Sequence, residues 1–79
     1  MESTYQIEEI PIEDLGQTWG PRPTERMVEH VKRHGVLVPI LVTRTPDEDG
    51  VLALRVIDGN RRINAASDAG LATVPAIIL

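Results

Sequence analysis

Short apolar runs separated by polar turns are the main pattern along the chain, and they predict four strands. The stretch from Tyr5 to Ile12 alternates as a half-buried strand does, with a possible register shift at its Glu8-Glu9 pair. In the apolar run that follows Gly35, Pro39 has no backbone N–H to donate, so we expect the strand proper to begin at Ile40. The predicted strands span residues 5–12, 40–45, 51–57 and 74–79, and the polar turn 46–50 joins the second to the third in a hairpin.

Two further stretches have the spacing of amphipathic helices. In the first, Thr24 is placed to cap the helix, Met27, Val28 and Val31 share one face, and Gly35 stops it. The second is predicted to run from Asn60 to about Ala69 and to end at a left-handed Gly70, with its inward face formed by Ile63, Ala66 and Ala69. Residues 13–23 contain two Gly and two Pro around Trp19 and are predicted to be an irregular loop that Trp19 pins to the core.

The predicted element order is therefore β-α-β-β-α-β, an α+β fold in which helices cover at least one face of a sheet. With 79 residues the chain has room for a single domain, 1–79, with one aliphatic core, since Phe is absent and there are one Trp and one Tyr. A chain this poor in aromatic side chains is poorly suited to stack nucleic-acid bases.

Composition excludes several classes of chemistry. The chain has no cysteine, which rules out disulfides, thiolate zinc sites and a thiol nucleophile and fits a reducing cytosol. Its formal net charge of -4 argues against wrapping duplex DNA by general electrostatics. No apolar run approaches the roughly 20 residues of a membrane helix, so we expect a cytoplasmic protein that does not enter a membrane.

The sequence Asp58-Gly59-Asn60-Arg61-Arg62 carries the strongest chemical signal. A strand that turns through Gly directly into a helix presents unpaired backbone N–H groups and the positive end of the helix dipole, which favours an anion. Arg61 and Arg62 add two guanidinium groups that suit phosphate oxygens, although cations in a first turn oppose the dipole unless an anion is bound. The alternative is that both arginines are solvated or that one pairs with Asp58 or with the acidic turn 47–49.

Two other groups of polar residues have simpler explanations. His30 and His34 are spaced as a metal pair on one helix face, but no third ligand is fixed nearby, so we expect a solvated helix end and no metal site. The acidic turn Asp47-Glu48-Asp49 lacks the ligand spacing of a calcium loop and is predicted to be a hairpin turn.

Nearly the whole chain, from Tyr5 to Leu79, resembles the N-terminal domain of ParB-type partition proteins and the wider ParB/sulfiredoxin fold, which also includes free serine kinases. The resemblance is carried by four segments: Ile10-Pro11-Ile12 with Leu15; Gly35-Val36-Leu37-Val38-Pro39-Ile40; Asp58-Gly59-Asn60-Arg61-Arg62 with Ala65-Ala66; and Ala69-Gly70-Leu71 with Val74-Pro75-Ala76. It implies helices packed on a mixed sheet. We expect no helix-turn-helix reader in this protein, and Asn60 stands where partition proteins usually have Glu and sulfiredoxins have a catalytic Cys.

The resemblance also implies a ligand. In that family the corresponding turn binds nucleotide phosphates, which implies this role for Gly59, Asn60, Arg61 and Arg62, and we add Arg22 to the phosphate-binding set. The implied cofactor is a nucleoside triphosphate with Mg²⁺. The serine kinases further imply catalytic roles for Glu25, as general base, and for Asp58, although an acid such as Glu25 is also common in a first helical turn because it favours the dipole.

Three functional hypotheses follow. The leading one is a stand-alone ParB-like domain of phage, plasmid or mobile-element origin that binds a nucleotide or a nucleic-acid phosphate at the Asp58–Arg62 turn as a regulatory or DNA-partition module. The second is a metal-dependent phosphotransferase, NTPase or nuclease of the same fold that uses Glu25 and Asp58. The third is a protein-interaction module that pairs with a partner, or with itself as a homodimer, through the aliphatic edge of its last strand, Val74–Leu79.

Overall fold

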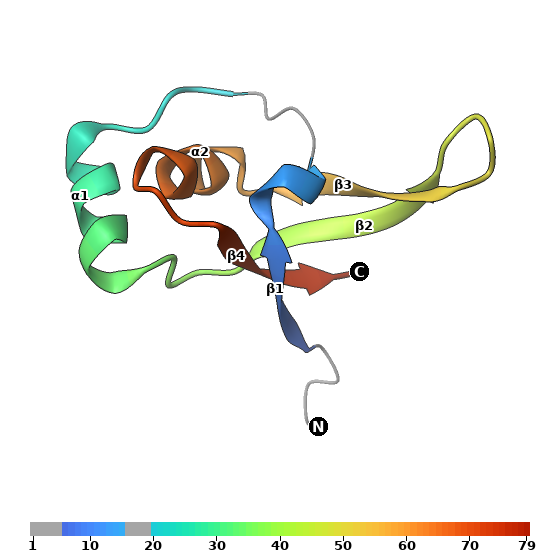
Figure 1. Ribbon diagram of the computed structural model, residues 1–79, viewed down its shortest axis with the longest axis horizontal. Coiled ribbons are helices and arrows are strands. Elements are labelled where there is room, and N and C mark those ends of the chain that lie inside the picture. Colours follow the sequence, from blue (N-terminus) through green and yellow to red (C-terminus); the bar gives the residue numbers. More distant parts are fainter. Residues whose placement is uncertain (1–5, 16–19) are drawn as a thin grey trace.

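The computed structural model describes residues 6–15 and 20–79 of the chain and consists of a four-stranded sheet, two α-helices and one 3-10 helix (Figure 1). The predicted β-α-β-β-α-β order is confirmed. In chain order the elements are β1 (Ile7–Pro11), η1 (Ile12–Leu15), α1 (Glu25–His34), β2 (Ile40–Pro46), β3 (Leu52–Asp58), α2 (Asn60–Asp68) and β4 (Thr73–Ile78).

The sheet is mixed, as expected, and its strands lie in the order β1-β4-β2-β3. β4 is antiparallel to β1 and parallel to β2, and β2 is antiparallel to β3 in the hairpin that the sequence predicts. The end of this hairpin extends beyond the rest of the molecule as an arm whose tip is the turn between β2 and β3 (Figure 1). At the tip, the Asp47 carboxylate accepts hydrogen bonds from the backbone N–H groups of Asp49 and Val51, each at 2.9 Å, so the acidic sequence forms a hairpin turn as predicted.

The prediction for the last strand needs a correction. Because β4 lies inside the sheet, with β1 on one side and β2 on the other, it offers no free edge along Val74–Leu79. Even Leu79, beyond the end of the strand, donates its backbone N–H to the Val42 carbonyl at 2.8 Å. A partner cannot pair with a strand whose backbone groups are already used within the sheet, so the edges available for pairing are β1 and β3.

The core lies between the sheet and α2. Alternate residues of the two central strands are fully buried, and α2 covers them with Ile63, Ala65 and Ala66, of which Ala65 was not predicted. α1 packs mainly against α2 and has Val31 as its buried residue, and it stands beside α2 at the end of the molecule away from the hairpin arm (Figure 1). The remaining buried residues are Ile10, Leu15, Ile40, Val42, Val74 and Ala76.

Local signals in the sequence determine where the helices begin and end. Thr24 caps α1 by accepting a hydrogen bond from the backbone N–H of Met27 at 3.1 Å, and α1 ends at Gly35, as predicted. α2 ends at Asp68 with Ala69 as its C-cap, and Gly70 follows in the predicted left-handed conformation, with φ at 84°, so that the N–H of Leu71 returns to the Ala66 carbonyl at 2.9 Å. The loop predicted between β1 and α1 is partly regular, because the chain leaves β1 through η1, which buries Leu15. The proposed anchoring role of Trp19 falls outside the described residues.

Candidate phosphate-binding site

Gly59 brings the start of α2 into direct contact with the sheet. It is the N-cap residue of α2, with φ at 118°, a region that side chains with a Cβ rarely adopt. A Cβ built on Gly59 would lie 2.5 Å from Cγ2 and 2.8 Å from Cβ of Ile40, a fully buried residue of β2. At this position of the turn between β3 and α2, glycine is therefore the one residue that fits without strain or a steric clash.

The first turn of α2 has backbone donors that find no partner within the helix itself. Within the described part of the chain, no side chain caps α2, and its first turn contains no acidic residue. The first backbone N–H to bond within the helix is that of Ile63, which donates to the Gly59 carbonyl at 3.0 Å. The preceding N–H groups, of Asn60 to Arg62, thus lie at the positive end of the helix dipole. α1 differs, since Thr24 caps it and Glu25 lies in its first turn.

The two arginines of this turn occupy different positions. Arg61 is exposed to solvent, whereas Arg62 folds back over the turn and places its Nη2 atom 3.3 Å from Oδ2 of Asp58. The Asp58 side chain is 70% exposed, so this ion pair contributes little to stability. Nε of Arg62 is buried and, among the described residues, has no hydrogen-bond partner. A buried donor without an acceptor destabilises the folded state, and an anion that accepts its hydrogen bond would remove this cost. The arrangement therefore favours anion binding at this turn.

A pocket of about 520 Å³ opens at this turn. The chain that leads into α1 passes over the start of α2 (Figure 1), and a Cβ on Gly20 would lie 3.7 Å from Cβ of Asn60. The pocket therefore has a wall that sequence reasoning did not find, although Gly20-Pro21 is a recognisable turn signal. Its lining consists of Gly20, Pro21, Met27, Ile57, Asp58, Gly59, Asn60, Arg61 and Arg62.

Five of the seven predicted site residues lie together, and two lie elsewhere. Asp58 to Arg62 line one pocket, but Arg22 places its guanidinium 3.4 Å from the carboxylate of Asp68, at the opposite end of α2. Glu25 lines a different hollow, of about 370 Å³, beside Lys32 and the same Asp68. This separation arises because the start of α1 lies next to the end of α2 (Figure 1). The structure thus does not bring Glu25 and Asp58 into one pocket.

His30 and His34 are both exposed on α1. The rings of His30 and His34 lie with their centroids 4.8 Å apart, and residues 6–15 and 20–79 contain no group of three or more His, Cys, Asp or Glu side chains that could hold a metal ion. No helix in the described ranges is both long and apolar enough to span a membrane.

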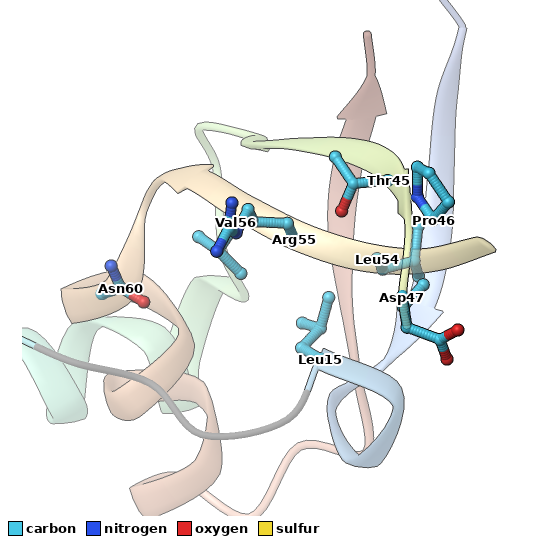
Figure 2. Close-up of a pocket in the computed structure, with 9 residues that line it drawn as sticks. Leu15, Thr45, Pro46, Asp47, Leu54, Arg55, Val56 and Asn60 are labelled. Atoms are coloured by element: carbon cyan, nitrogen blue, oxygen red, sulfur yellow. The ribbon is translucent and has the colours of Figure 1, made fainter. Parts of the chain in front are cut away.

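A second hollow, of about 530 Å³, lies on the other side of Asn60, between η1 and the hairpin arm (Figure 2). Leu15 points from η1 toward β3, and the side chains of Leu54 and Val56 lie along β3. No local pattern predicts this hollow, because its walls come from segments that lie far apart in the sequence. Its lining consists of Leu15, Thr45, Pro46, Asp47, Ala53, Leu54, Arg55, Val56 and Asn60.

The fold and the site together define a small α+β domain with a glycine turn and two arginines at the start of its second helix. Comparison with known proteins gives the family. The model of the ParB N-terminal domain matches residues 1–79, and the chain belongs to this family. The chain is 36% identical over 77 residues to the chromosome-partitioning protein ParB of Caulobacter vibrioides, a match that covers 89% of this chain and 25% of that protein. It is 40% identical over 78 residues to a probable plasmid-partitioning protein ParB of Thermus thermophilus, covering 94% of this chain and 25% of that protein.

Solved structures agree with this assignment. The C-terminally truncated ParB of Caulobacter crescentus complexed to the centromeric parS site matches with a TM-score of 0.70 at 37% identity, over 91% of this chain and 40% of that one. The same protein complexed with CTP-gamma-S matches with a TM-score of 0.68 at 30% identity, over 94% of this chain and 44% of that one. Sulfiredoxin from Arabidopsis thaliana matches with a TM-score of 0.65 at 25% identity, over 94% of this chain and 84% of that one. The chain spans about a quarter of the length of the curated relatives it matches.

Proposed function

We propose that this domain binds a phosphate group of a nucleotide or of a nucleic acid at the Asp58–Arg62 turn and acts as a binding or regulatory module. The observation that carries the proposal is the start of α2, where one pocket is lined by the first residues of the helix, by the exposed Arg61 and by Arg62, whose buried Nε has no hydrogen-bond partner among the described residues. Backbone N–H donors and positive charge lie together there, and the first turn of α2 contains no acidic side chain to neutralise them. This arrangement favours an anion at a helix N-terminus.

Phosphate binding would satisfy each of these groups. Phosphate oxygens accept from the N–H groups of the first turn, and Gly59 lets them approach the backbone closely. Arg62 would exchange part of its ion pair with Asp58 for a contact with the phosphate, and its buried Nε would gain an acceptor. Arg61 would contact the ligand from the solvent side. The freed Asp58 carboxylate is the group on this turn suited to a Mg²⁺ ion that accompanies a triphosphate.

The relatives support two ligand classes. One structural relative is complexed with CTP-gamma-S and another with the centromeric parS site, which are a nucleoside triphosphate analogue and a DNA site. We therefore propose CTP or another nucleoside triphosphate with Mg²⁺, and nucleic-acid phosphate, as the ligands to test. We place the domain in a DNA-partition setting in the cytoplasm, acting by itself in a phage, plasmid or other mobile element.

Calorimetric titration of the protein with CTP, ATP and a short single-stranded DNA, each with and without Mg²⁺, tests the proposal directly. The informative variants are Arg61→Ala and Arg62→Ala, with Arg33→Ala as the matched control because Arg33 is also exposed but lies at the end of α1. Loss of one charge-assisted contact is expected to weaken binding by at least about tenfold in either site variant and to leave the control unchanged. Binding to none of the ligands, or equal binding by all four proteins, would overturn the proposal.

A further inference from the structure

The two edges of the sheet differ in how well they are protected from pairing with another strand. β1 has five residues, of which two are acidic, and it ends in Pro11. β3 has seven residues without proline, and five of the seven are exposed. Short length, charge and proline are the usual means by which a sheet edge is kept from adding strands, so β1 is protected whereas β3 is largely open.

The hydrogen-bond pattern of the hairpin shows which groups of β3 face outward. Asp47 donates its backbone N–H to the Val51 carbonyl at 2.9 Å, and the Val51 N–H donates to the Asp47 carboxylate, so the polar backbone groups of Val51 face inward across the hairpin. Hydrogen-bonded and non-bonded pairs alternate along an antiparallel ladder, and the next pair, Pro46 with Leu52, has no N–H on its proline. The backbone N–H and C=O groups of Leu52, Leu54 and Val56 therefore point away from β2, toward the open edge.

The same alternation places three aliphatic side chains in one row along β3. Leu54 and Val56 pack against the core, while Leu52, farther along the arm, is 62% exposed. Beside this row lies the hollow of about 530 Å³ between η1 and the arm, which Leu15, Leu54 and Val56 line (Figure 2). One strand thus carries both an exposed aliphatic side chain near its start and, near its end, a hollow whose lining combines the aliphatic Leu15, Leu54 and Val56 with polar residues.

We infer that two copies of this chain associate through their β3 edges, antiparallel and about a two-fold axis at Leu54. In this register Leu54 faces Leu54 of the second copy in a hydrogen-bonded pair, and Leu52 faces Val56 of the second copy. Each exposed Leu52 then enters the hollow of the other copy, so the surface is complementary to itself, as a two-fold interface requires. Arg55 faces Ala53 of the second copy, which keeps the two Arg55 side chains from lying directly opposite each other.

Charge favours the same arrangement. Continuing the antiparallel register beyond the strand brings the tip of the hairpin of one copy, with its acidic turn, to the level of the start of α2 in the other. That turn carries three acidic side chains, and the start of α2 has its helix dipole, Arg61 and Arg62. An extended peptide from another protein would satisfy the backbone groups of β3 but would need its own aliphatic and acidic residues to match these features, so the second copy is the occupant that the surface favours.

Analytical ultracentrifugation of Leu52→Lys tests the surface. Leu37→Lys is the matched control, because Leu37 is 67% exposed but lies in the loop between α1 and β2. From micromolar to millimolar concentration we expect the wild type and the control to rise from 8.7 kDa toward twice that mass, and Leu52→Lys to associate about tenfold more weakly. Circular dichroism would establish that both variants are folded. A wild type that stays monomeric, or an unchanged Leu52→Lys, would overturn the inference.

Disulfide crosslinking tests the register, and it is unambiguous here because the chain has no native cysteine. Leu54→Cys places the two thiols in a directly opposed pair with Cα atoms about 5.5 Å apart, within the range that a disulfide bridges. In the proposed register Arg55 faces Ala53 of the second copy, so the two thiols of Arg55→Cys lie diagonally across the interface and not directly opposite each other. Under mild oxidation we expect the first variant to form covalent dimers much faster than the second. Equal rates, or faster crosslinking of Arg55→Cys, would refute the proposed axis.

Discussion

Replacing Gly59 with alanine tests whether the start of α2 is held against the sheet as closely as the structure indicates. Two costs add. A residue with a Cβ at φ 118° is strained by about 1–3 kcal/mol. The new methyl group would also meet Cγ2 of Ile40 at 2.5 Å, and relieving such overpacking in a buried site costs about 1–3 kcal/mol more. The total, about 2–6 kcal/mol, is a large part of the stability expected for a domain of this size.

Urea unfolding followed by circular dichroism measures this loss, and Gly50→Ala separates its two parts. Gly50 also has a positive φ, of 81°, but a Cβ there would meet nothing within 4 Å, so this variant bears the backbone strain alone. We expect Gly59→Ala to lose about 1–3 kcal/mol more than Gly50→Ala. Equal losses in the two variants would refute the close contact between Gly59 and Ile40.

Three further predictions concern stability and the ligand. Thr24→Ala, which removes the hydrogen bond to the Met27 N–H, is expected to cost about 1 kcal/mol in chemical unfolding, while Thr24→Ser should cost much less. Ile63→Ala, at a side chain only 1% exposed, is expected to cost about 2–5 kcal/mol in the same assay, and a loss below 1 kcal/mol would show that α2 is not packed as described. Arg22→Ala breaks an exposed ion pair with Asp68, so we expect unfolding to change by less than about 1 kcal/mol and calorimetric affinity for a nucleotide to stay within about twofold, whereas a tenfold loss of affinity would place Arg22 in the binding site.

Predictions that rested on local signals agree with the structure. Thr24, Gly35 and Gly70 mark helix ends because capping depends on backbone groups within a few residues. The start of β2 at Ile40 followed from the missing N–H of Pro39 in the same way. The Asp58–Arg62 pocket was also predictable, since consecutive residues at a turn into a helix must lie together.

Predictions that needed long-range packing were less successful. Nothing near Val74–Leu79 in the sequence indicates that β1, from the start of the chain, and β2, from its middle, lie on either side of β4, so its edge was wrongly expected to be free. Arg22 was added to the phosphate-binding set, and Glu25 was linked to Asp58 by resemblance, whereas in the structure both lie near Asp68. The hollow beside Leu15 was missed because η1 and β3 meet only in three dimensions.

The central position of β4 has a consequence for the order of folding. β1 pairs with β4 in a register that joins Ile7 to Ile77 and Pro11 to Thr73, so these contacts close loops of more than sixty residues. A growing chain emerges from the ribosome with β1 early, and that strand has no neighbour in the sheet until β4 has been synthesised. The hairpin and α2 can form earlier from local contacts, but the complete sheet cannot. Contacts of such high sequence separation slow folding, so β1 is expected to dock last.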